Sequence, residues 1–432
     1  MVISYEERRW REQLELEELR SYQLSRLNSL LERVLPENRF YAQKYQSIRL
    51  PLRSWEAFRE LPFTTKEELI TSEVAGFAAH HTFPLDRYVR LHRTSGTQGR
   101  PLTILDTAED WQWWIDGWQF VLDAAGITSA DRVLLAFSFG PFIGFWSAYD
   151  ACAARGALVI PTGGMTTLAR VDMIQTLRPT CVLCTPSYAL HLAEVARQNN
   201  IDLSGAGVRK LIVAGEPGGS IPSVRQRIEA AWGAVVIDHS GATEVGPWGY
   251  ADCQRRGLHV NESEFIAEFR PIPENGAVFD AEGQLAELVI TTLGRVGCPV
   301  IRYRTGDLVR PIRKHHLSNR FVLLDGGVLG RVDDMVTVRG VNVFPSALDC
   351  LLREFPEIDE YRITVYRERE LDELRIEVED RAHQPQRIAE FIQRRLGLRV
   401  HVVEVPGGSL PRFEGKARRF VDQRKLVSDH HR

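Results

Sequence analysis

The chain has little cysteine, no long apolar run and no excess of either charge. Its 432 residues include six unevenly spaced cysteines, which excludes a small disulfide scaffold and is typical of a reducing compartment. No apolar stretch approaches the ~20 residues that span a bilayer. The 54 basic and 57 acidic residues nearly cancel, which disfavours an electrostatic nucleic-acid binder. We therefore expect a cytoplasmic protein with no membrane or nucleic-acid partner.

The composition and length predict a globular protein of two or three domains. Hydrophobic residues make up 44% and charged residues 26% of the chain, an ordinary soluble mixture. The mixed charges of the N-terminal segment disfavour a signal or transit peptide. Leucines at roughly helical spacing predict one helix over residues 5–35, ended by Pro36 and packed on the main body.

Apolar runs and amphipathic stretches alternate from about residue 88 to residue 240, which predicts an α/β fold with parallel-sheet layers. The expected strands are 132–137, 157–161, 181–184, 210–214 and 234–237, and the expected helices are 168–177, 188–198 and 223–232. Short strands and Gly/Pro-rich turns predict a β-rich subdomain over 256–330. After Arg331 a compact α+β unit of about 100 residues follows, a typical small-domain size.

Two polar segments contain residues suited to bind a phosphate group or a metal ion. Thr94–Pro101 combines hydroxyls, glycines and Arg100, so its backbone N–H groups suit phosphate oxygens, although an ordinary polar turn fits equally. His239–Gly246 follows an apolar run, and ligands gather at the carboxyl ends of strands in open α/β sheets. There Glu244 suits magnesium and Thr243 suits a phosphate, but the same residues are also typical of a helix N-cap.

Three further segments each allow a structural and a functional interpretation. Tyr303–Leu308 places Asp307 on a tight turn after a strand, where it suits ribose hydroxyls or serves simply as a β-turn residue. The adjacent aspartates in Gly330–Pro345 suit a metal pair, a hinge or a solvated turn. Leu410–Lys416 lies on a basic tail, and its lysine either reaches a ligand from a loop or is solvated.

In this order the five segments resemble the motifs of the adenylate-forming superfamily, and most closely its phenylacetate–CoA ligase branch. The resemblance runs from Leu61–Leu69 to Lys416 and covers nearly the whole chain. It implies an N-terminal ATP- and acid-binding domain over residues 1–332 and a mobile, hinged C-terminal domain over residues 333–432. It also implies an AMP-forming acid–thiol ligase that uses ATP and Mg²⁺ to form an acyl-adenylate and then transfers the acyl group to coenzyme A.

The resemblance also implies roles for individual residues. Lys416 would bridge the carboxylate and the α-phosphate, Thr243 would contact the α-phosphate, Glu244 would hold magnesium, and Arg331 would lie beside ribose and phosphate. The implied ATP- and AMP-binding residues are Thr94, Ser95, Gly96, Thr97, Gly99, Arg100, Gly215, Glu216, Pro217, His239, Ser240, Gly241 and Asp307. The implied hinge is Asp333, and Gly340 would line the thiol channel.

This chain departs from the family pattern at two places. Ser240 stands where an aromatic residue usually stacks on adenine, so we expect Tyr250 or His239 to compensate. Several relatives bind zinc; here Cys253, His259 and His316 form a candidate set of three ligands, whereas structural zinc normally has four. Without zinc, Cys253 is expected to be a small core residue. The pair Cys181 and Cys184 lies in an apolar strand and is expected to be core.

In this architecture the acid should lie beside an aromatic, glycine-rich segment. The expected pocket residues are Phe137, Phe139, Gly140, Phe142 and Trp146. Such walls suit an aryl acid, although core packing explains the same aromatics. The stripe Trp111, Trp114 and Trp118 on one helical face is more typical of a core than of a cofactor contact.

Two alternatives to an aryl acid–CoA ligase stay open. One is a biosynthetic adenylating enzyme that passes the acyl group to a carrier-protein thiol, an amine or another nucleophile. The other is a nucleotide-binding protein without turnover, which would have no need of Lys416. A homodimer is also compatible with the sequence.

Overall fold

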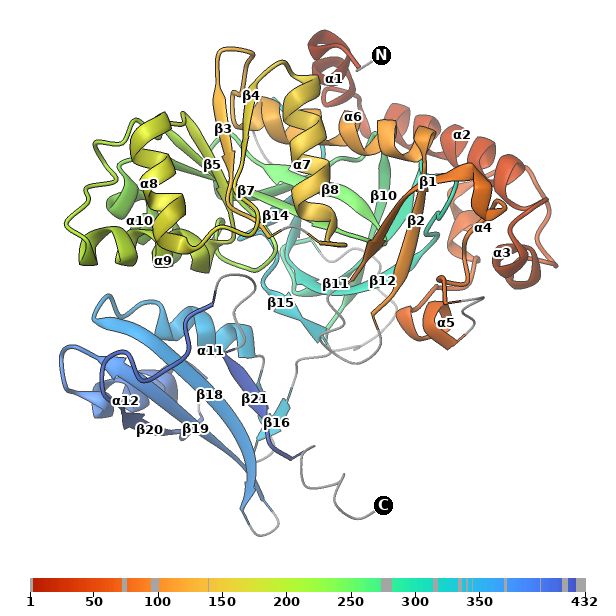
Figure 1. The fold of residues 1–432 in the computed structure, drawn as a ribbon. Coiled ribbons are helices and arrows are strands. Elements are labelled where there is room, and N and C mark those ends of the chain that lie inside the picture. Colours follow the sequence, from red (N-terminus) through yellow and green to blue (C-terminus); the bar gives the residue numbers. More distant parts are fainter. Residues whose placement is uncertain are drawn as a thin grey trace.

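The computed structural model describes most of the chain (Figure 1). The described residues are 3–71, 76–94, 101–138, 140–272, 282–313, 318–332, 336–338, 341–343, 345–368, 371–396, 398–413 and 419–424. None of the helices in these ranges is both long and apolar enough to cross a membrane.

A nine-stranded sheet forms the centre of the N-terminal part. Its strand order is β13-β14-β9-β8-β7-β6-β5-β3-β4. The parallel strands are β3 (Arg132–Leu135), β4 (Leu158–Pro161), β5 (Cys181–Cys184), β6 (Lys210–Val213) and β7 (Val235–Ala242). The antiparallel strands are β8 (Gly246–Ala251), β9 (Gly257–Val260), β13 (Pro311–Ile312) and β14 (Leu323–Asp325). The expected α/β fold is therefore confirmed, and all five expected strands form within a few residues of their predicted bounds.

Helices cover both faces of the parallel strands, as Figure 1 shows. The bounds are α6 (Ala108–Ala124) and α7 (Ile143–Ala154) on one side, and α8 (Thr167–Leu177), α9 (Pro186–Gln198) and α10 (Pro222–Trp232) on the other. Alternate strand residues point to opposite faces. In β5, Cys181 and Leu183 therefore pack on the α6–α7 side, whereas Val182 and Cys184 pack on the α8–α10 side. Both cysteines are buried in the core, as expected.

Smaller sheets flank the central one. A four-stranded sheet has the order β10-β11-β12-β15, and β1 pairs with β2. Their bounds are β1 (Tyr88–Arg93), β2 (Thr103–Thr107), β10 (Phe265–Pro271), β11 (Ala286–Thr292), β12 (Tyr303–Val309) and β15 (Gly330–Arg331), with the short helix η1 (Leu85–Arg87) before β1. Strands β10, β11 and β12 lie in the range 256–330, where the sequence predicts a β-rich part, whereas β9, β13 and β14 of the same range extend the central sheet.

The residues from Val336 onward form a hydrophobic core of their own. Its sheet has the order β20-β19-β18-β21, and β16 pairs with β17. The bounds are β16 (Val336–Val338), β17 (Val341–Val343), α11 (Pro345–Leu352), β18 (Ile358–Glu368), β19 (Leu371–Asp380), α12 (Pro385–Leu396), β20 (His401–Glu404) and β21 (Phe420–Asp422). Helices and strands therefore alternate after Arg331, as expected for an α+β unit.

The single helix expected over residues 5–35 is wrong. The chain forms α1 (Tyr5–Arg11) and α2 (Leu16–Val34), separated by a turn, and α3 (Arg39–Lys44), α4 (Trp55–Arg59) and α5 (Lys66–Thr71) follow. Glu15 caps α2 with a reciprocal capping box, so helix α2 restarts where α1 ends. Buried leucines of α2 pack on the body, as the leucine pattern predicts.

The turn between α1 and α2 buries a carboxyl group against the central sheet. Glu12 accepts a hydrogen bond from the Tyr250 hydroxyl at 2.6 Å and pairs with Arg9 at 2.7 Å. Burial raises the pKa of Glu12 from 4.5 to about 7, against the lowering effects of Arg9, Tyr250 and Arg8 and with a small raising effect of Asp123.

We expect the contribution of Glu12 to the stability of the protein to fall as pH rises between about 4.5 and 7. In that window the folded protein keeps the Glu12 proton and the unfolded chain releases it, so ionisation favours unfolding. Glu12→Gln should remove this dependence and gain about 2–3 kcal/mol relative to the parent between pH 4.5 and pH 8. Thermal melts of both proteins at the two pH values measure the gain. Equal pH dependence in the two proteins would contradict the assignment.

Candidate functional site

The segment His239–Gly246 is a hairpin turn, and the alternative of a helix N-cap is wrong. Residues 243–245 connect β7 to β8, and the Val245 N–H donates to the Ala242 carbonyl at 3.0 Å. Because β7 is a parallel strand of the main sheet, this turn lies beyond its carboxyl end, where α/β sheets bind ligands. Thr243 and Glu244 stand together at the tip of the turn.

Tyr303 connects this turn to the neighbouring sheet. Its hydroxyl donates to Glu244 Oε1 at 3.0 Å. Burial, followed by the charge of Glu244, raises the pKa of Tyr303 well above its usual value, so the hydroxyl keeps its proton. Arg331 and Asp307 also act electrostatically on Tyr303. Two carboxylates, a guanidinium and a phenol thus share one small region.

Asp307 lies within β12, and the expected tight turn at this position is wrong. The strand is irregular there, because Gly306 has φ 75°, a backbone conformation that favours glycine. Asp307 Oδ1 accepts from Arg331 Nη1 at 2.9 Å, and the two residues are register partners across β12 and β15. The sequence motifs at 303–308 and 330–331 are therefore brought together by strand pairing.

Arg295 holds the β7–β8 turn from behind. Its Nη1 donates to the Thr243 carbonyl at 2.9 Å, and its Nη2 donates to Asp106 at 2.6 Å. Arg295 and Asp106 are both fully buried, and the guanidinium lies 5.6 Å from the centre of the Trp114 ring. A buried charge requires a partner of this kind. The main chain of Thr243 is thus fixed by a rigid ion pair.

A second loop lies at the carboxyl end of β6. Gly215 has φ 95°, and Glu216 accepts from the Ser187 N–H at 2.7 Å, at the start of α9. Nearby, Ser220 donates to Asp238 at 2.5 Å, and burial raises the pKa of Asp238 to about 6. The loop that contains Pro217 is therefore anchored to both α9 and β7.

The expected acid-binding segment lies around the start of α7. Phe142 precedes the helix and is 45% exposed, whereas Phe137 is half-buried against the main core. Gly140 has φ 121°, and its carbonyl accepts from Trp146 Nε1 at 2.9 Å. This glycine and the Trp146 hydrogen bond set the path of the loop.

His239 and Ser240 point to opposite faces of β7, because neighbouring strand residues alternate. The His239 ring packs against Trp118, with ring centres 4.4 Å apart, and its Nδ1–H donates to the Gly249 carbonyl at 2.7 Å. Tyr250 is buried against Phe120 and bonded to Glu12. The Tyr250 ring is therefore core, with no face open to an adenine ring.

Two arginines of the C-terminal part contact the N-terminal part. Arg412 Nε lies 3.5 Å from Glu194 Oε2 on α9. Arg419 pairs with Glu360 at 2.5 Å, and its Nη1 donates to Ser187 Oγ at 3.2 Å. These residues flank 414–418 on both sides. The described residues Arg412 and Arg419 are thus attached beside α9.

Several residues of the expected site lie outside the described ranges. They are Ser95, Gly96, Thr97, Gly99, Arg100, Phe139, His316, Asp333, Gly340 and Lys416. Of the described remainder, Thr94 lies at the end of β1, where its hydroxyl accepts from the Leu102 N–H at 2.9 Å, and the exposed Gly241 lies on β7. Among the described residues, no group of three His, Cys, Asp or Glu is arranged to hold a metal ion.

The two described members of the candidate zinc set differ in their environment. Cys253 is exposed, so the expectation of a core cysteine is wrong. His259 is buried, and its Nδ1 lies 3.0 Å from the Phe321 carbonyl. With His316 outside the described residues, the structure adds no support for zinc.

The sequence alone does not identify Tyr303, Arg295 and Asp106 as functional residues. Asp106 and Arg295 stand 189 positions apart, in segments without a recognisable spacing. The only signal is a charged residue inside an otherwise apolar strand pattern at 102–107, which by itself has many explanations.

Comparisons with known proteins match the chain over nearly its whole length. A model of the AMP-binding enzyme family matches residues 42–275, and a model of the AMP-binding enzyme C-terminal domain matches residues 340–424. The chain is 32% identical to the phenylacetate-coenzyme A ligase of Escherichia coli, covering 95% of this chain and 96% of the relative. It is 31% identical to the ligase of the same description from Thermus thermophilus, covering 96% and 98%.

Solved structures of 2-hydroxyisobutyryl-CoA ligase match this chain to different degrees, depending on the state in which that enzyme was captured. In its postadenylation state with an acyl-AMP it gives a TM-score of 0.90 at 28% identity, covering 100% of this chain and 95% of that one. In its thioesterification state the TM-score is 0.73 at 29% identity, with the same coverage. Because both are one protein, the different TM-scores measure conformation. The present arrangement is similar to the postadenylation state.

We expect removal of Arg295 alone to destabilise the protein strongly. Arg295→Met leaves the buried Asp106 carboxylate without its partner and should lower the free energy of unfolding by about 3–5 kcal/mol. The double variant Asp106→Leu/Arg295→Met removes both charges and should recover most of that loss. Chemical denaturation measures both variants; a double variant no more stable than the single one would contradict the assignment.

Proposed function

The chain belongs to the family of AMP-binding enzymes, and from that premise we propose that it is an AMP-forming acid–coenzyme A ligase acting on an aromatic carboxylic acid. A carboxylate oxygen attacks the α-phosphorus of ATP, and the bond to pyrophosphate breaks, which leaves an acyl-adenylate. The sulfur of coenzyme A then attacks the acyl carbon, AMP leaves, and the thiol proton is released. The carboxylate needs no general base, because it is ionised near neutral pH.

The observation that carries this proposal is the gathering of Glu244, Asp307 and Arg331 around Tyr303, beside the turn after β7 that also contains Thr243. Thr243 would contact the α-phosphate and Asp307 the ribose hydroxyls. Arg331 would lie beside both, and its bond to Asp307 keeps the guanidinium oriented before a nucleotide binds. Displacement at phosphorus requires positioning and charge stabilisation more than covalent chemistry. The full-length similarity to acid–CoA ligases supports the same interpretation.

Glu244 is suited to hold Mg²⁺ together with the phosphates of ATP. Magnesium commonly takes only one or two protein carboxylates, because phosphate and water oxygens complete its shell. The Tyr303 hydroxyl donates a hydrogen bond to Oε1 of Glu244, which fixes the orientation of the Glu244 carboxylate. When bound, the ion neutralises phosphate charge.

The C-terminal part would supply Lys416 to the adenylation step. Arg412 and Arg419 attach the flanking chain beside α9 and Ser187, and Ser187 in turn is bonded to Glu216 of the loop implied to bind ATP and AMP. A rotation about Asp333 would then bring Gly340 to the thiol channel. Mobile domains often complete two different sites in turn.

The aromatic nature of the acid is inferred from the wall around Phe137, Phe142 and Trp146, together with Gly140, whose positive φ sets the loop. Coenzyme A is the favoured acceptor because the similar relatives are described as coenzyme A ligases. A carrier-protein thiol or an amine would use the same adenylate.

The proposal is tested by ATP–pyrophosphate exchange with a panel of aryl acids, followed by AMP release with and without coenzyme A. Exchange together with coenzyme-A-dependent AMP release is the expected result. Exchange that does not respond to coenzyme A would instead support the biosynthetic adenylating enzyme. Nucleotide binding without exchange for any acid would support the non-catalytic alternative.

We expect Lys416→Ala to separate the two half-reactions. Loss of the positive charge beside the carboxylate and the α-phosphate should slow adenylation by at least about 100-fold, whereas thioester formation from a supplied acyl-adenylate should be retained. Lys210→Ala is the matched control. Lys210 begins β6, at the end of the strand away from the Gly215 loop, and its ammonium group donates to the Gly126 carbonyl. Adenylation at the parent rate in Lys416→Ala would refute the role.

We expect a smaller effect of the same sign from Glu194→Gln. It weakens the 3.5 Å contact with Arg412 that is present in the postadenylation-like arrangement. Exposed ion pairs contribute about 0–1 kcal/mol, so adenylation should slow by up to about fivefold. Rapid-quench kinetics measures the rate of each half-reaction. An equal slowing of thioester formation would contradict the expectation that only adenylation is slowed.

A further inference from the structure

Helix α6 carries four buried tryptophans, and their indole N–H groups fall into two classes. Trp111 Nε1 donates to Asp150 at 2.7 Å, and Trp113 Nε1 donates to Glu264 at 2.8 Å. Trp114 and Trp118 are 2% and 3% exposed, yet their Nε1 atoms have no acceptor among the described residues. Buried donors are rarely left unpaired, because each loses its bond to water. Two such donors on one helix therefore require an explanation.

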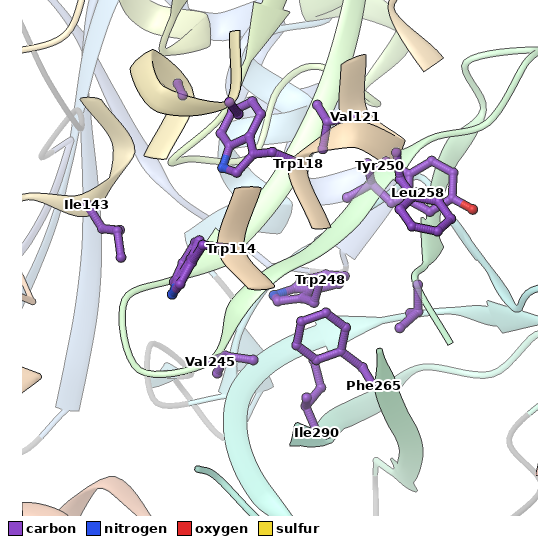
Figure 2. Close-up of a cluster of buried hydrophobic side chains, with 14 of the residues drawn as sticks. Trp114, Trp118, Val121, Ile143, Val245, Trp248, Tyr250, Leu258, Phe265 and Ile290 are labelled. Carbon is purple, nitrogen blue, oxygen red and sulfur yellow. The ribbon is translucent and has the colours of Figure 1, made fainter. Parts of the chain in front are cut away.

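The two unpaired donors lie on the same side of their cluster. In Figure 2 the nitrogens of Trp114 and Trp118 lie on the side of Ile143, away from Phe265 and Tyr250. Ile143 begins α7, directly after Phe142 of the expected acid-binding segment. Trp114 and Trp118 thus belong to the same buried cluster as Ile143, at the start of the helix that follows the expected acid-binding segment.

An acceptor lies beside them. His239 packs on Trp118 with ring centres 4.4 Å apart. Burial lowers the pKa of His239 to about 4, so the ring is neutral near pH 7. Its proton lies on Nδ1, because that atom donates to the Gly249 carbonyl. Nε2 therefore carries a lone pair that can accept a hydrogen bond. His239 also stands only four residues before Thr243, on the strand that leads to the reaction site.

We propose that Trp118 and His239, with Trp114 as a second donor, select an aromatic acid that carries a hydroxyl group. A hydroxyl accepts from an indole N–H and donates to an unprotonated imidazole nitrogen, so one group satisfies both partners. An unsubstituted ring of similar size would leave the buried Trp118 N–H unpaired, and a site of this kind rejects such an analogue. The inference rests on the proposed function in taking the acid as the ligand.

The experiment compares phenylacetate, its three ring-hydroxylated isomers and the three matching methyl compounds in ATP–pyrophosphate exchange. We expect the best hydroxy isomer to exceed phenylacetate and its own methyl counterpart at least about tenfold in kcat/KM. Trp118→Phe removes the donor and keeps an aromatic ring, and His239→Leu removes the acceptor. Each should reduce the preference to within about twofold, mainly by lowering the value for the hydroxy acid.

Trp10→Phe is the matched control, because Trp10 is 54% exposed on α1, and it should retain the full preference. Melting temperatures verify that each variant is folded. A parent enzyme without preference for any hydroxy isomer, or a preference that survives both Trp118→Phe and His239→Leu, would overturn the proposal.

Binding of the same acids by isothermal calorimetry separates this inference from the proposed function. If no acid supports exchange but the hydroxy preference appears in Kd and disappears in the two variants, selection by Trp118 and His239 stands and the ligase proposal fails. If exchange occurs without the preference, the ligase proposal stands and this inference fails.

Discussion

A fully buried ion pair between Arg295 and Asp106 holds the turn on which the site depends. Asp106 comes from β2 and Arg295 from the segment after β11, and the guanidinium reaches the Thr243 carbonyl between β7 and β8. A buried arginine requires a charged partner, because burial removes its bonds to water. The pair therefore fixes the relative positions of three separate sheets. That arrangement holds in place the main chain at the tip of the turn, which carries Thr243 and Glu244.

The C-terminal part is attached beside α9 by two contacts of different kinds. The Arg419–Ser187 bond joins an arginine to a buried serine. The Arg412–Glu194 pair is partly exposed, with side chains that are 22% and 29% exposed. Exposed pairs are individually weak. Such contacts suit an arrangement that has to be released, in keeping with the different match to the two states of 2-hydroxyisobutyryl-CoA ligase.

Periodicity in the sequence predicted the parallel strands and the helices between them, because buried strands and amphipathic helices leave strong local patterns. It failed where a local signal was ambiguous. The leucines of residues 5–35 show one helical pattern, yet Glu15 restarts the helix with its own cap. Asp307 was expected on a turn because Gly-Asp favours turns, but pairing with β15 keeps it in a strand. Cys253 was expected in the core, and only the folded chain shows it exposed.

The sequence by itself determined the order of the motifs, the two compositional parts and the family resemblance, since these depend only on residues close together along the chain. Tertiary structure alone decided that Asp106 reaches Arg295 and that Tyr303 reaches Glu244, because each pair joins segments that are distant along the chain and meet only where separate sheets pack together. It also decided which tryptophans of α6 find an acceptor. An indole N–H is the same in every sequence, but whether it is paired depends on what the fold places opposite it.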